Sequence, residues 1–344
     1  DSLRVTFGKN HNNRPHGYVN IIMERELHSD IAAVVVTYNR SKDLMICIDA
    51  LLNQTKTPDE IIIVNNQSPD DTEQRLSEAG LVDLTNYKKT EFGKESTLEY
   101  PDNGKPVKIT YLLKKENDGG AGGFYAGMKT AFDKGYEWIL LMDDDGRPDK
   151  DEIRELFNVA GKHGFLYSNA LVINRDNPSE LAFNLFSTPI ETAYYDSIEY
   201  LPDCGSPFNG TFINRKLIEK IGFIKKEMFI WGDEAEYTAR AKEAGHPITT
   251  ICSARHFHPK TGKSQNMIPF VSRWGILPPA TKRARIFYRN QCYIFTRYNQ
   301  RGNLRKFATR NILGAFLNLQ WKYIPGMIKA IRTGIKGDFS KNLY

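Results

Sequence analysis

Three consecutive carboxylates, Asp143, Asp144 and Asp145, follow the apolar run WILLM at positions 138–142. Adjacent like charges repel one another, so acids placed directly after a buried strand require a positive partner. Side chains two residues apart in an extended segment share a face, and we therefore expect Asp143 and Asp145 to point into one cleft and Asp144 elsewhere. Two carboxylates on one face suit Mg²⁺ or Mn²⁺, ions that also hold substrate phosphates. The alternative is an acidic turn that caps the helix after it.

Two histidines in the segment ARHFHPK, His256 and His258, lie two residues apart on a predicted strand. Histidine is the commonest metal ligand, but a lone histidine is more often structural. Beside a carboxylate site, either His256 or His258 could complete the shell of the ion. The spacing does not decide between them.

The glycine-rich segment NDGGAGGF (117–124) connects a predicted strand to a predicted helix. Glycine lets the backbone approach a ligand, and a helix N-terminus favours anions, so Gly122 is a candidate ligand contact. The dinucleotide pattern GxGxxG is not met, because Tyr125 stands where a third glycine would follow Gly120 and Gly122. A tight turn that needs glycine for steric reasons explains the segment equally well.

The segment WGDEAEY places Asp233, Glu234 and Glu236 at the start of a predicted helix. Acids are favoured there by the helix dipole and as caps. A carboxylate in a cleft can instead act as a general base. The spacing alone leaves both interpretations open.

The elements that must position these residues alternate between strand and helix. Continuous apolar runs predict strands buried on both faces at 31–40, 59–68, 107–113 and 137–142. Apolar residues at helical spacing predict helices at 42–54, 121–135 and 150–164. This alternation predicts an α/β fold with a mostly parallel sheet, in which ligands bind beyond the carboxyl ends of the strands.

The chain divides into three predicted parts: an N-terminal extension at 1–30, an α/β domain at 31–279 and a basic helical region at 280–344. Residues 80–106, rich in Lys, Glu, Asn and Gly, are interpreted as a surface insertion. Four cysteines without a CxxC pair predict reduced thiols in a cytosolic protein, and no apolar run is long enough to span a bilayer.

Charge is distributed unevenly within the net +6. Residues 1–243 carry 29 Lys and Arg against 40 Asp and Glu, whereas residues 244–344 carry 18 against a single acid, Asp338. Six aromatics are interleaved with the cations of 282–310. An anionic membrane surface and a nucleic acid are the candidate partners, and the plain alternative is a basic helix pair packed on an acidic domain.

The motifs together resemble those of a known family. AVVVTYNR, IIIVNNQS, ENDGGAGGFYAGM, WILLMDDDG, FNGTFINR, FIWGDEAEY and FHP follow one another as in family 2 glycosyltransferases, which have the GT-A fold. The glycine-rich turn, DDDG, LAF at 181–183, FNG and GDE most resemble those of bacterial galactofuranosyltransferases. The resemblance covers about residues 31–295.

The resemblance implies an inverting, metal-dependent transfer of galactofuranose from UDP-galactofuranose to a lipid-linked or cell-surface glycan. It implies Mn²⁺ or Mg²⁺ as the cofactor, held by Asp143, Asp145 and His258. Glu234 matches the catalytic base, with Asp233 capping the helix or orienting the acceptor. Donor contacts are expected from Thr37, Tyr38, Asn39, Arg40, Asn65, Gly122, Asp143 and Asp144.

Two positions depart from the family pattern. Asn65 stands where an aspartate usually accepts from the uracil N–H, although its amide oxygen can also accept. Glu234 stands where aspartate is common. The preference for a particular nucleotide base is the property that the Asn65 departure affects.

Other functions remain open. A rhamnosyltransferase using dTDP-rhamnose shares the strand motifs and the late YRN at 288–290. A nucleic-acid-binding protein would use the basic region but leaves the acidic cleft unexplained, so no nucleic acid is expected. A non-catalytic glycan-binding module would show no metal-dependent nucleotide binding. The preferred function predicts a peripheral protein at the cytoplasmic face of the plasma membrane, beside anionic lipid.

Overall fold

The computed structural model describes residues 30–101, 106–185, 188–206, 208–260, 266–268, 271–276 and 282–340, with the side chains of 266–283 left out. The predicted extension 1–30 lies outside this range except for Asp30, and so does the predicted boundary at 279 and 280.

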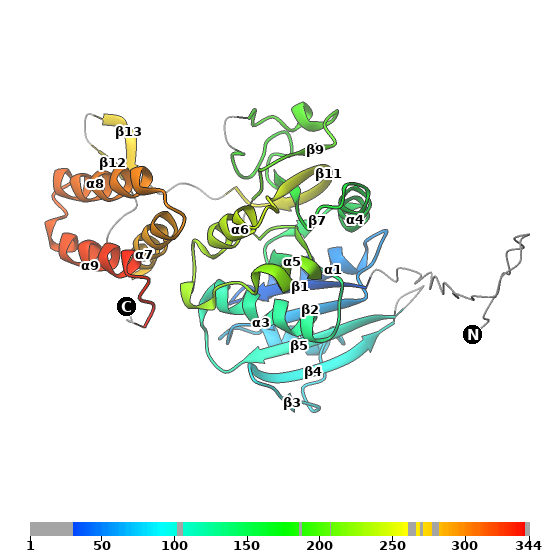
Figure 1. The fold of residues 1–344 in the computed structure, drawn as a ribbon. Helices are drawn as coiled ribbons and strands as arrows, with labels where there is room; N and C mark the ends of the chain where they lie inside the picture. The colour runs from blue at the N-terminus through cyan, green and yellow to red at the C-terminus, as the bar shows by residue number, and fades with distance from the viewer. Residues whose placement is uncertain are drawn as a thin grey trace, which may run out of the picture.

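A large mixed sheet forms the centre of the chain (Figure 1). Its strands run in the order β3-β4-β5-β2-β1-β6-β10-β8-β11-β7, and β9 pairs with β11. Their bounds are β1 Ile31–Thr37, β2 Glu60–Asn65, β3 Lys88–Lys89, β4 Gly93–Tyr100, β5 Val107–Lys114, β6 Trp138–Asp143, β7 Arg147–Pro148, β8 Tyr167–Asn174, β9 Tyr200–Leu201, β10 Thr211–Asn214 and β11 Thr249–His258. The central strands β5, β2, β1 and β6 are parallel, whereas β4 and β10 on either side of them are antiparallel.

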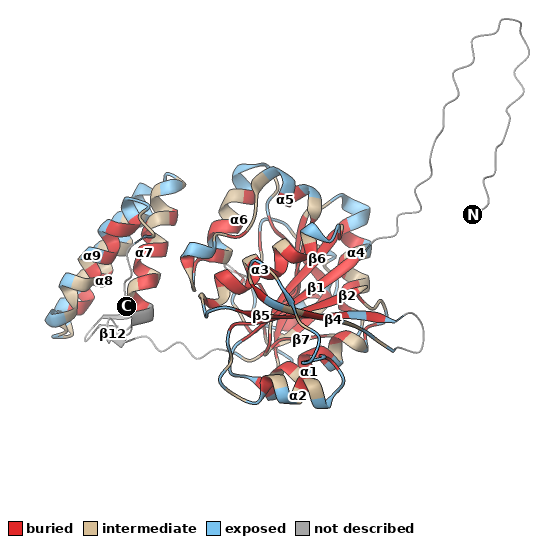
Figure 2. Cartoon of the chain, turned by 90° about the horizontal axis from the view of Figure 1, so that it is seen from below, coloured by how far each residue is buried: buried red, intermediate tan, exposed pale blue. Residues whose placement is uncertain are grey.

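Helices cover both faces of the sheet. Their bounds are α1 Ser41–Leu52, α2 Thr72–Glu78, α3 Gly119–Asp133, α4 Glu152–His163, α5 Arg215–Ile221 and α6 Asp233–Glu243. Short 3-10 turns span η1 Thr192–Tyr195 and η2 Lys226–Met228. One core joins alternate residues of β1 to α1 and α4, and a second joins the intervening residues of β1 to α3, α5 and α6. β1 is therefore buried on both faces, as its continuous apolar run predicts (Figure 2).

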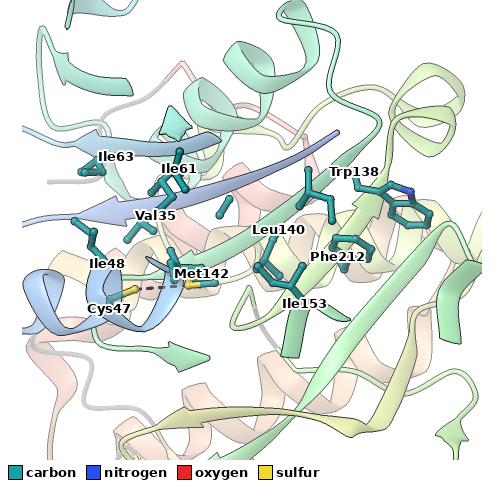
Figure 3. Packing of buried hydrophobic residues seen from close by; sticks show 14 of the residues in the cluster. Val35, Cys47, Ile48, Ile61, Ile63, Trp138, Leu140, Met142, Ile153 and Phe212 are labelled. Atoms are coloured by element: carbon teal, nitrogen blue, oxygen red, sulfur yellow. Dashed lines mark hydrogen bonds between the residues drawn. The ribbon is translucent and has the colours of Figure 1, made fainter. Parts of the chain in front are cut away.

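Tight packing in the first core fixes the strand that carries the three aspartates. Cys47 of α1 contacts Met142 of β6, with 3.6 Å between their sulfurs (Figure 3). At the other end of β6, the rings of Trp138 and Phe212 stack 4.5 Å apart. All four cysteines are buried and unpaired, which agrees with the expectation of reduced thiols.

The helical region after the sheet has its own core. It comprises α7 Lys282–Arg297, α8 Arg301–Leu317, η3 Trp321–Tyr323 and α9 Ile324–Ile335, preceded by the hairpin β12 Asn266–Ile268 and β13 Val271–Ile276. Tyr288, Cys292, Met327 and Ile331 are among its buried residues. Within the described part of the chain, no helix is long and apolar enough to cross a bilayer.

The α/β fold with a mostly parallel centre and a C-terminal helical region is confirmed. The interpretation of 80–106 as a surface insertion is wrong, because β4 pairs along its whole length with β5. β4 is an outer strand whose polar residues face solvent. Its sequence GKESTLEY contains few apolar residues, so the buried face is not evident from the sequence.

Candidate active site

The carboxyl ends of three parallel strands bring the predicted site segments together. Thr37 ends β1, Asn65 ends β2 and Asp143 ends β6. Thr37 pairs in register with Asn65, and Asp143 pairs with Val36, the neighbour of Thr37. These chain segments, distant in sequence, therefore meet at one edge of the sheet, where parallel α/β folds bind their ligands.

Asp144 points toward the end of β1, contrary to the expectation from strand spacing that it points away from this edge, although the family resemblance places it among the donor contacts. β6 ends at Asp143, so Asp144 lies in a turn and the alternation of a strand does not apply. Its carboxylate accepts from Thr37 Oγ1 at 2.8 Å and from the backbone N–H of Tyr38 at 3.3 Å. Arg40 lies 3.3 Å from its other oxygen. Burial raises the pKa of Asp144 to about 6, against the opposing effects of Thr37 and Arg40.

Asp145 and His258 form the pair best suited to hold a metal. Oδ1 of Asp145 lies 3.2 Å from Nε2 of His258, and Arg40 approaches the other oxygen. The Nδ1 of His258 donates to the Pro259 carbonyl at 2.7 Å, because a carbonyl can only accept. Nε2 of a neutral ring therefore directs its lone pair at a carboxylate, and that arrangement requires a proton or a cation between them. Burial alone would raise the pKa of Asp145, but His258 and Arg40 outweigh it and lower that pKa.

His256 has a different partner, so the structure distinguishes the two histidines. Its Nδ1 lies 3.0 Å from Glu152, and both side chains are fully buried. A Cβ at Gly146 would collide with the His256 ring. His256 thus lies under the turn that follows Asp145, whereas His258 lies beside Asp145 itself.

Asp145 and His258 alone do not complete the coordination shell of a metal ion. Within the described residues, no group of three His, Cys, Asp or Glu side chains stands ready to bind an ion. Mg²⁺ usually keeps several waters and binds through one or two carboxylates plus substrate phosphates, so the pair fits that mode. Burial, followed by the charges of Asp144 and Asp145, raises the pKa of Asp143 well above its usual range. A cation in this space would offset that accumulation of negative charge.

A second group of acids lies within electrostatic reach of the first. Asp233 and Glu234 begin α6, directly after Gly232, whose φ is +114°. Glu234 accepts from the Gly232 N–H at 3.2 Å, whereas Asp233 is buried. Burial, then the charge of Glu234, raises the pKa of Asp233 well above its usual range, and Asp143 adds to this effect. Asp143 and the acids at the start of α6 are therefore close enough for their charges to interact.

Glu236, the third acid of WGDEAEY, is engaged elsewhere. It is buried and pairs with Arg240 at 2.7 Å. It also accepts from the hydroxyl of Tyr298, the residue after α7, at 3.0 Å. Its role is to join α6 to the C-terminal helices.

Asn290 on α7 is a site residue that the sequence reasoning missed. Its fully buried amide donates to the carbonyls of Met228 at 2.9 Å, Ile230 at 3.1 Å and Trp231 at 2.8 Å. The same stretch contains left-handed backbone at Phe229 and Trp231, with φ of +67° and +60°. α7 therefore fixes the strained turn that presents Asp233 and Glu234, and the only signal in the sequence is the YRN at 288–290.

Asn65 and Asn39 shape the neighbouring loops. Asn65 is buried, donates to the Tyr111 hydroxyl at 2.8 Å and accepts from the Ser68 N–H at 2.7 Å. Its amide oxygen retains one further lone pair. Asn39 has φ of +58° and donates its N–H to Ser68 Oγ at 2.9 Å.

The glycine-rich turn packs against the loop before α6. The N–H of Ala121 donates to the Phe229 carbonyl at 3.1 Å. A Cβ at Gly119 would collide with that carbonyl, and one at Gly122 would collide with the Asp118 carboxylate. These contacts give both glycines a steric reason to be glycine.

Known proteins resemble this chain in sequence. The profile of the family described as "Glycosyl transferase family 2" matches residues 32–222. Over 277 residues the chain is 30% identical to "Galactofuranosyltransferase GlfT1" of Mycolicibacterium smegmatis, which spans 77% of this chain and 83% of that protein. The protein of the same name from Mycobacterium tuberculosis is 31% identical over 274 residues, 77% of this chain and 82% of that one.

Solved structures with a similar chain path include the S. aureus protein TarS 1–349 in complex with UDP, with a TM-score of 0.48, 13% identity and coverage of 91% of this chain and 89% of that one. Another is the mannosyltransferase PcManGT from Pyrobaculum calidifontis in complex with GDP-Man and Mn²⁺, with a TM-score of 0.47, 13% identity and coverage of 89% and 72%. The family match extends over more than half of the chain, and the relatives align along most of their length. The chain therefore belongs to glycosyl transferase family 2 and is a glycosyltransferase of the predicted GT-A fold class.

Proposed function

We propose that the protein transfers galactofuranose from UDP-galactofuranose to a lipid-linked or cell-surface glycan, using Mn²⁺ or Mg²⁺. The GlfT1 relatives are named galactofuranosyltransferases and align with 77% of this chain, which supports galactofuranose as the transferred sugar. One observation supports the metal: Nε2 of His258 lies 3.2 Å from Oδ1 of Asp145. The Nδ1 proton of the same ring is donated to the Pro259 carbonyl.

Asp145 and His258 would hold the ion, with Asp143 as the third ligand. When bound, the ion neutralises the donor diphosphate and makes UDP a better leaving group. Thr37, Tyr38 and Arg40 surround Asp144 and keep its carboxylate fixed at the end of β1. Arg40, half-exposed beside two aspartates, also supplies a positive charge at the rim of the donor site.

Glu234 is the proposed base. As the acceptor hydroxyl oxygen bonds to the anomeric carbon, the bond from that carbon to the diphosphate oxygen breaks on the opposite face. The hydroxyl proton passes to Glu234, the anomeric configuration inverts, and UDP leaves. Burial favours the protonated form of Asp233, which can then donate a hydrogen bond to an acceptor hydroxyl.

A lipid-linked acceptor would place the enzyme at the cytoplasmic face of the plasma membrane. The support is the balance of 18 cations against one acid in residues 244–344, which suits an anionic leaflet.

A donor screen tests the proposal. Nucleotide release is measured with UDP-galactofuranose and with dTDP-rhamnose, each with Mn²⁺ and with a chelator. We expect release from UDP-galactofuranose that depends on the metal. Nucleotide release from dTDP-rhamnose but not from UDP-galactofuranose would establish the rhamnosyltransferase alternative. Equal release with Mn²⁺ and with the chelator would exclude a metal requirement.

A further inference from the structure

Exposed apolar side chains gather at one place in the C-terminal helices. Of eleven large hydrophobic residues exposed in the described part of the chain, five lie within nine positions around the end of α8. We name these residues the apolar tip: Leu313, Phe316, Leu317, Leu319 and Trp321. Leu319 is 75% exposed and Trp321 is 56% exposed. Scattered single apolar residues are ordinary on a surface, whereas a contiguous group indicates a binding face.

One residue of the apolar tip, Leu319, has a backbone conformation that is unfavourable for leucine. Leu319 has a left-handed φ of +57° just after α8, a conformation for which glycine or asparagine is usual. By contrast, α4 ends on Gly164 in that conformation. A leucine side chain that stays in solvent at such a position does not stabilise the folded chain.

The aromatic part of the apolar tip is prepared for an apolar environment. The indole N–H of Trp321 donates to the Phe316 carbonyl at 2.9 Å, so its one polar group has a partner inside the protein. The Phe316 and Trp321 rings lie 5.9 Å apart. Such a pair can leave water without exposing an unsatisfied donor.

The two helices that the apolar tip joins are positively charged, and Arg310 and Lys322 are the cations nearest to it in sequence. From the start of α8 to the residue after α9 the cations are Arg301, Arg305, Lys306, Arg310, Lys322, Lys329, Arg332 and Lys336. A hollow of about 510 Å³ begins at Ile324 and includes Lys329, Arg332 and Lys336 in its lining, with Asp338 as its acid. A second copy of the chain would bring like charges together, whereas an anionic lipid surface complements both the cations and the apolar side chains.

The position of the apolar tip suits a surface outside the protein. Figure 1 shows the connection from α8 to α9 at the end of the helical region farthest from the sheet. The other side of this region holds the active-site turn through Asn290 of α7. The helices therefore link an outward apolar surface to the loop that carries Asp233 and Glu234.

We propose that the apolar tip inserts into the boundary between headgroups and acyl chains of an anionic bilayer. The inference deepens the proposed membrane association and does not depend on the transferase chemistry. The test therefore uses lipid binding, whose failure is distinguishable from failure of sugar transfer.

The experiment is co-sedimentation of the full chain with vesicles of phosphatidylcholine alone or of an equimolar mixture with phosphatidylglycerol. We expect binding to the mixture, lowered roughly a hundredfold in a Leu319→Ser, Trp321→Ser double variant, because two large apolar side chains no longer leave water. A control variant, Ile46→Ser with Tyr194→Ser, changes two exposed apolar residues outside the helical region and should bind as the wild type does.

Quenching of tryptophan fluorescence by brominated lipid gives a second measurement on the wild-type chain, which does not depend on a variant folding. We expect quenching that is lost in Trp321→Phe. Equal binding of the double variant and the wild type would overturn the proposal, as would absence of quenching. Sedimentation velocity without lipid provides the remaining outcome: a dimer that the double variant abolishes would assign the apolar tip to self-association instead.

Discussion

Replacing Asn290 by alanine should slow sugar transfer and leave donor binding intact. Asn290 lies on α7, outside the sheet, but its amide holds the carbonyls of Met228, Ile230 and Trp231 in the turn before α6. That turn leads into α6 and sets the direction of Glu234, the proposed base.

The magnitude follows from the hydrogen bonds. A buried carbonyl that loses its hydrogen-bond donor costs about 1–3 kcal/mol. The Met228 carbonyl keeps a donor in Arg289, so the loss falls on the carbonyls of Ile230 and Trp231 and amounts to roughly 2–4 kcal/mol after partial relief by water. Left-handed backbone at Phe229 and Trp231 stores on the order of 1–3 kcal/mol at each residue, which favours relaxation once the amide is gone. A shift of about 2–3 kcal/mol away from the aligned turn would lower turnover by roughly 30- to 150-fold.

The assay compares turnover at saturating UDP-galactofuranose, UDP affinity by calorimetry, and melting temperature. Asn290→Asp keeps the size of the side chain but directs an oxygen at three carbonyls, so it should be at least as damaging as Asn290→Ala. Asn311→Ala is the matched control: Asn311 is also buried, but its amide donates within α8 to the Phe307 carbonyl at 2.8 Å. Wild-type turnover in a folded Asn290→Ala protein would refute the reasoning. Equal losses in Asn290→Ala and Asn311→Ala would reduce the effect to general destabilisation.

Three further variants test the site. Asp145→Ala should abolish metal-dependent UDP binding while the fold survives, as circular dichroism and calorimetry would record; unchanged UDP and Mn²⁺ affinity would contradict it. Glu234→Gln should lower turnover by roughly 10²–10⁴-fold with donor affinity nearly intact, whereas Asp233→Asn should weaken acceptor binding or stability more than the chemical step; the reverse pattern would exchange their roles. Gly146→Ala should lower the melting temperature and UDP affinity together, because its Cβ would displace the buried His256 ring; an unchanged variant would show that the aspartate turn can shift freely.

The sequence predicts the centre of the fold because the strands there are apolar on both faces. β1, β2 and β6 carry continuous apolar runs, and the residues just after them meet at one sheet edge without further information. β4 escapes prediction because its sequence GKESTLEY has only two large apolar residues, Leu98 and Tyr100, too few to show the alternation of a strand. The orientation of Asp144 escapes prediction because Asp144 and Asp145 lie in a turn after β6, whereas the prediction assumed an extended segment through all three aspartates.

Residues that act through distant partners also lie beyond the sequence. Asn290 reaches Met228 across 62 positions, and His256 reaches Glu152 across 104. Neither separation carries a periodicity that could reveal the contact. The choice between His256 and His258 depends on which ring the sheet directs toward Asp145, and only the folded chain determines that.

The central claim is that His258 and Asp145 hold an ion that binds the donor diphosphate. Calorimetric titration of UDP into the wild type, His258→Ala and His246→Ala, each with Mn²⁺ and with a chelator, tests it most directly. His246 is half-buried and its Nε2 lies 2.9 Å from Lys220, away from the three aspartates, so His246→Ala serves as the control. We predict that Mn²⁺ strengthens UDP binding in the wild type and in His246→Ala and has little effect in His258→Ala. Equal enhancement by Mn²⁺ in all three proteins would contradict the account.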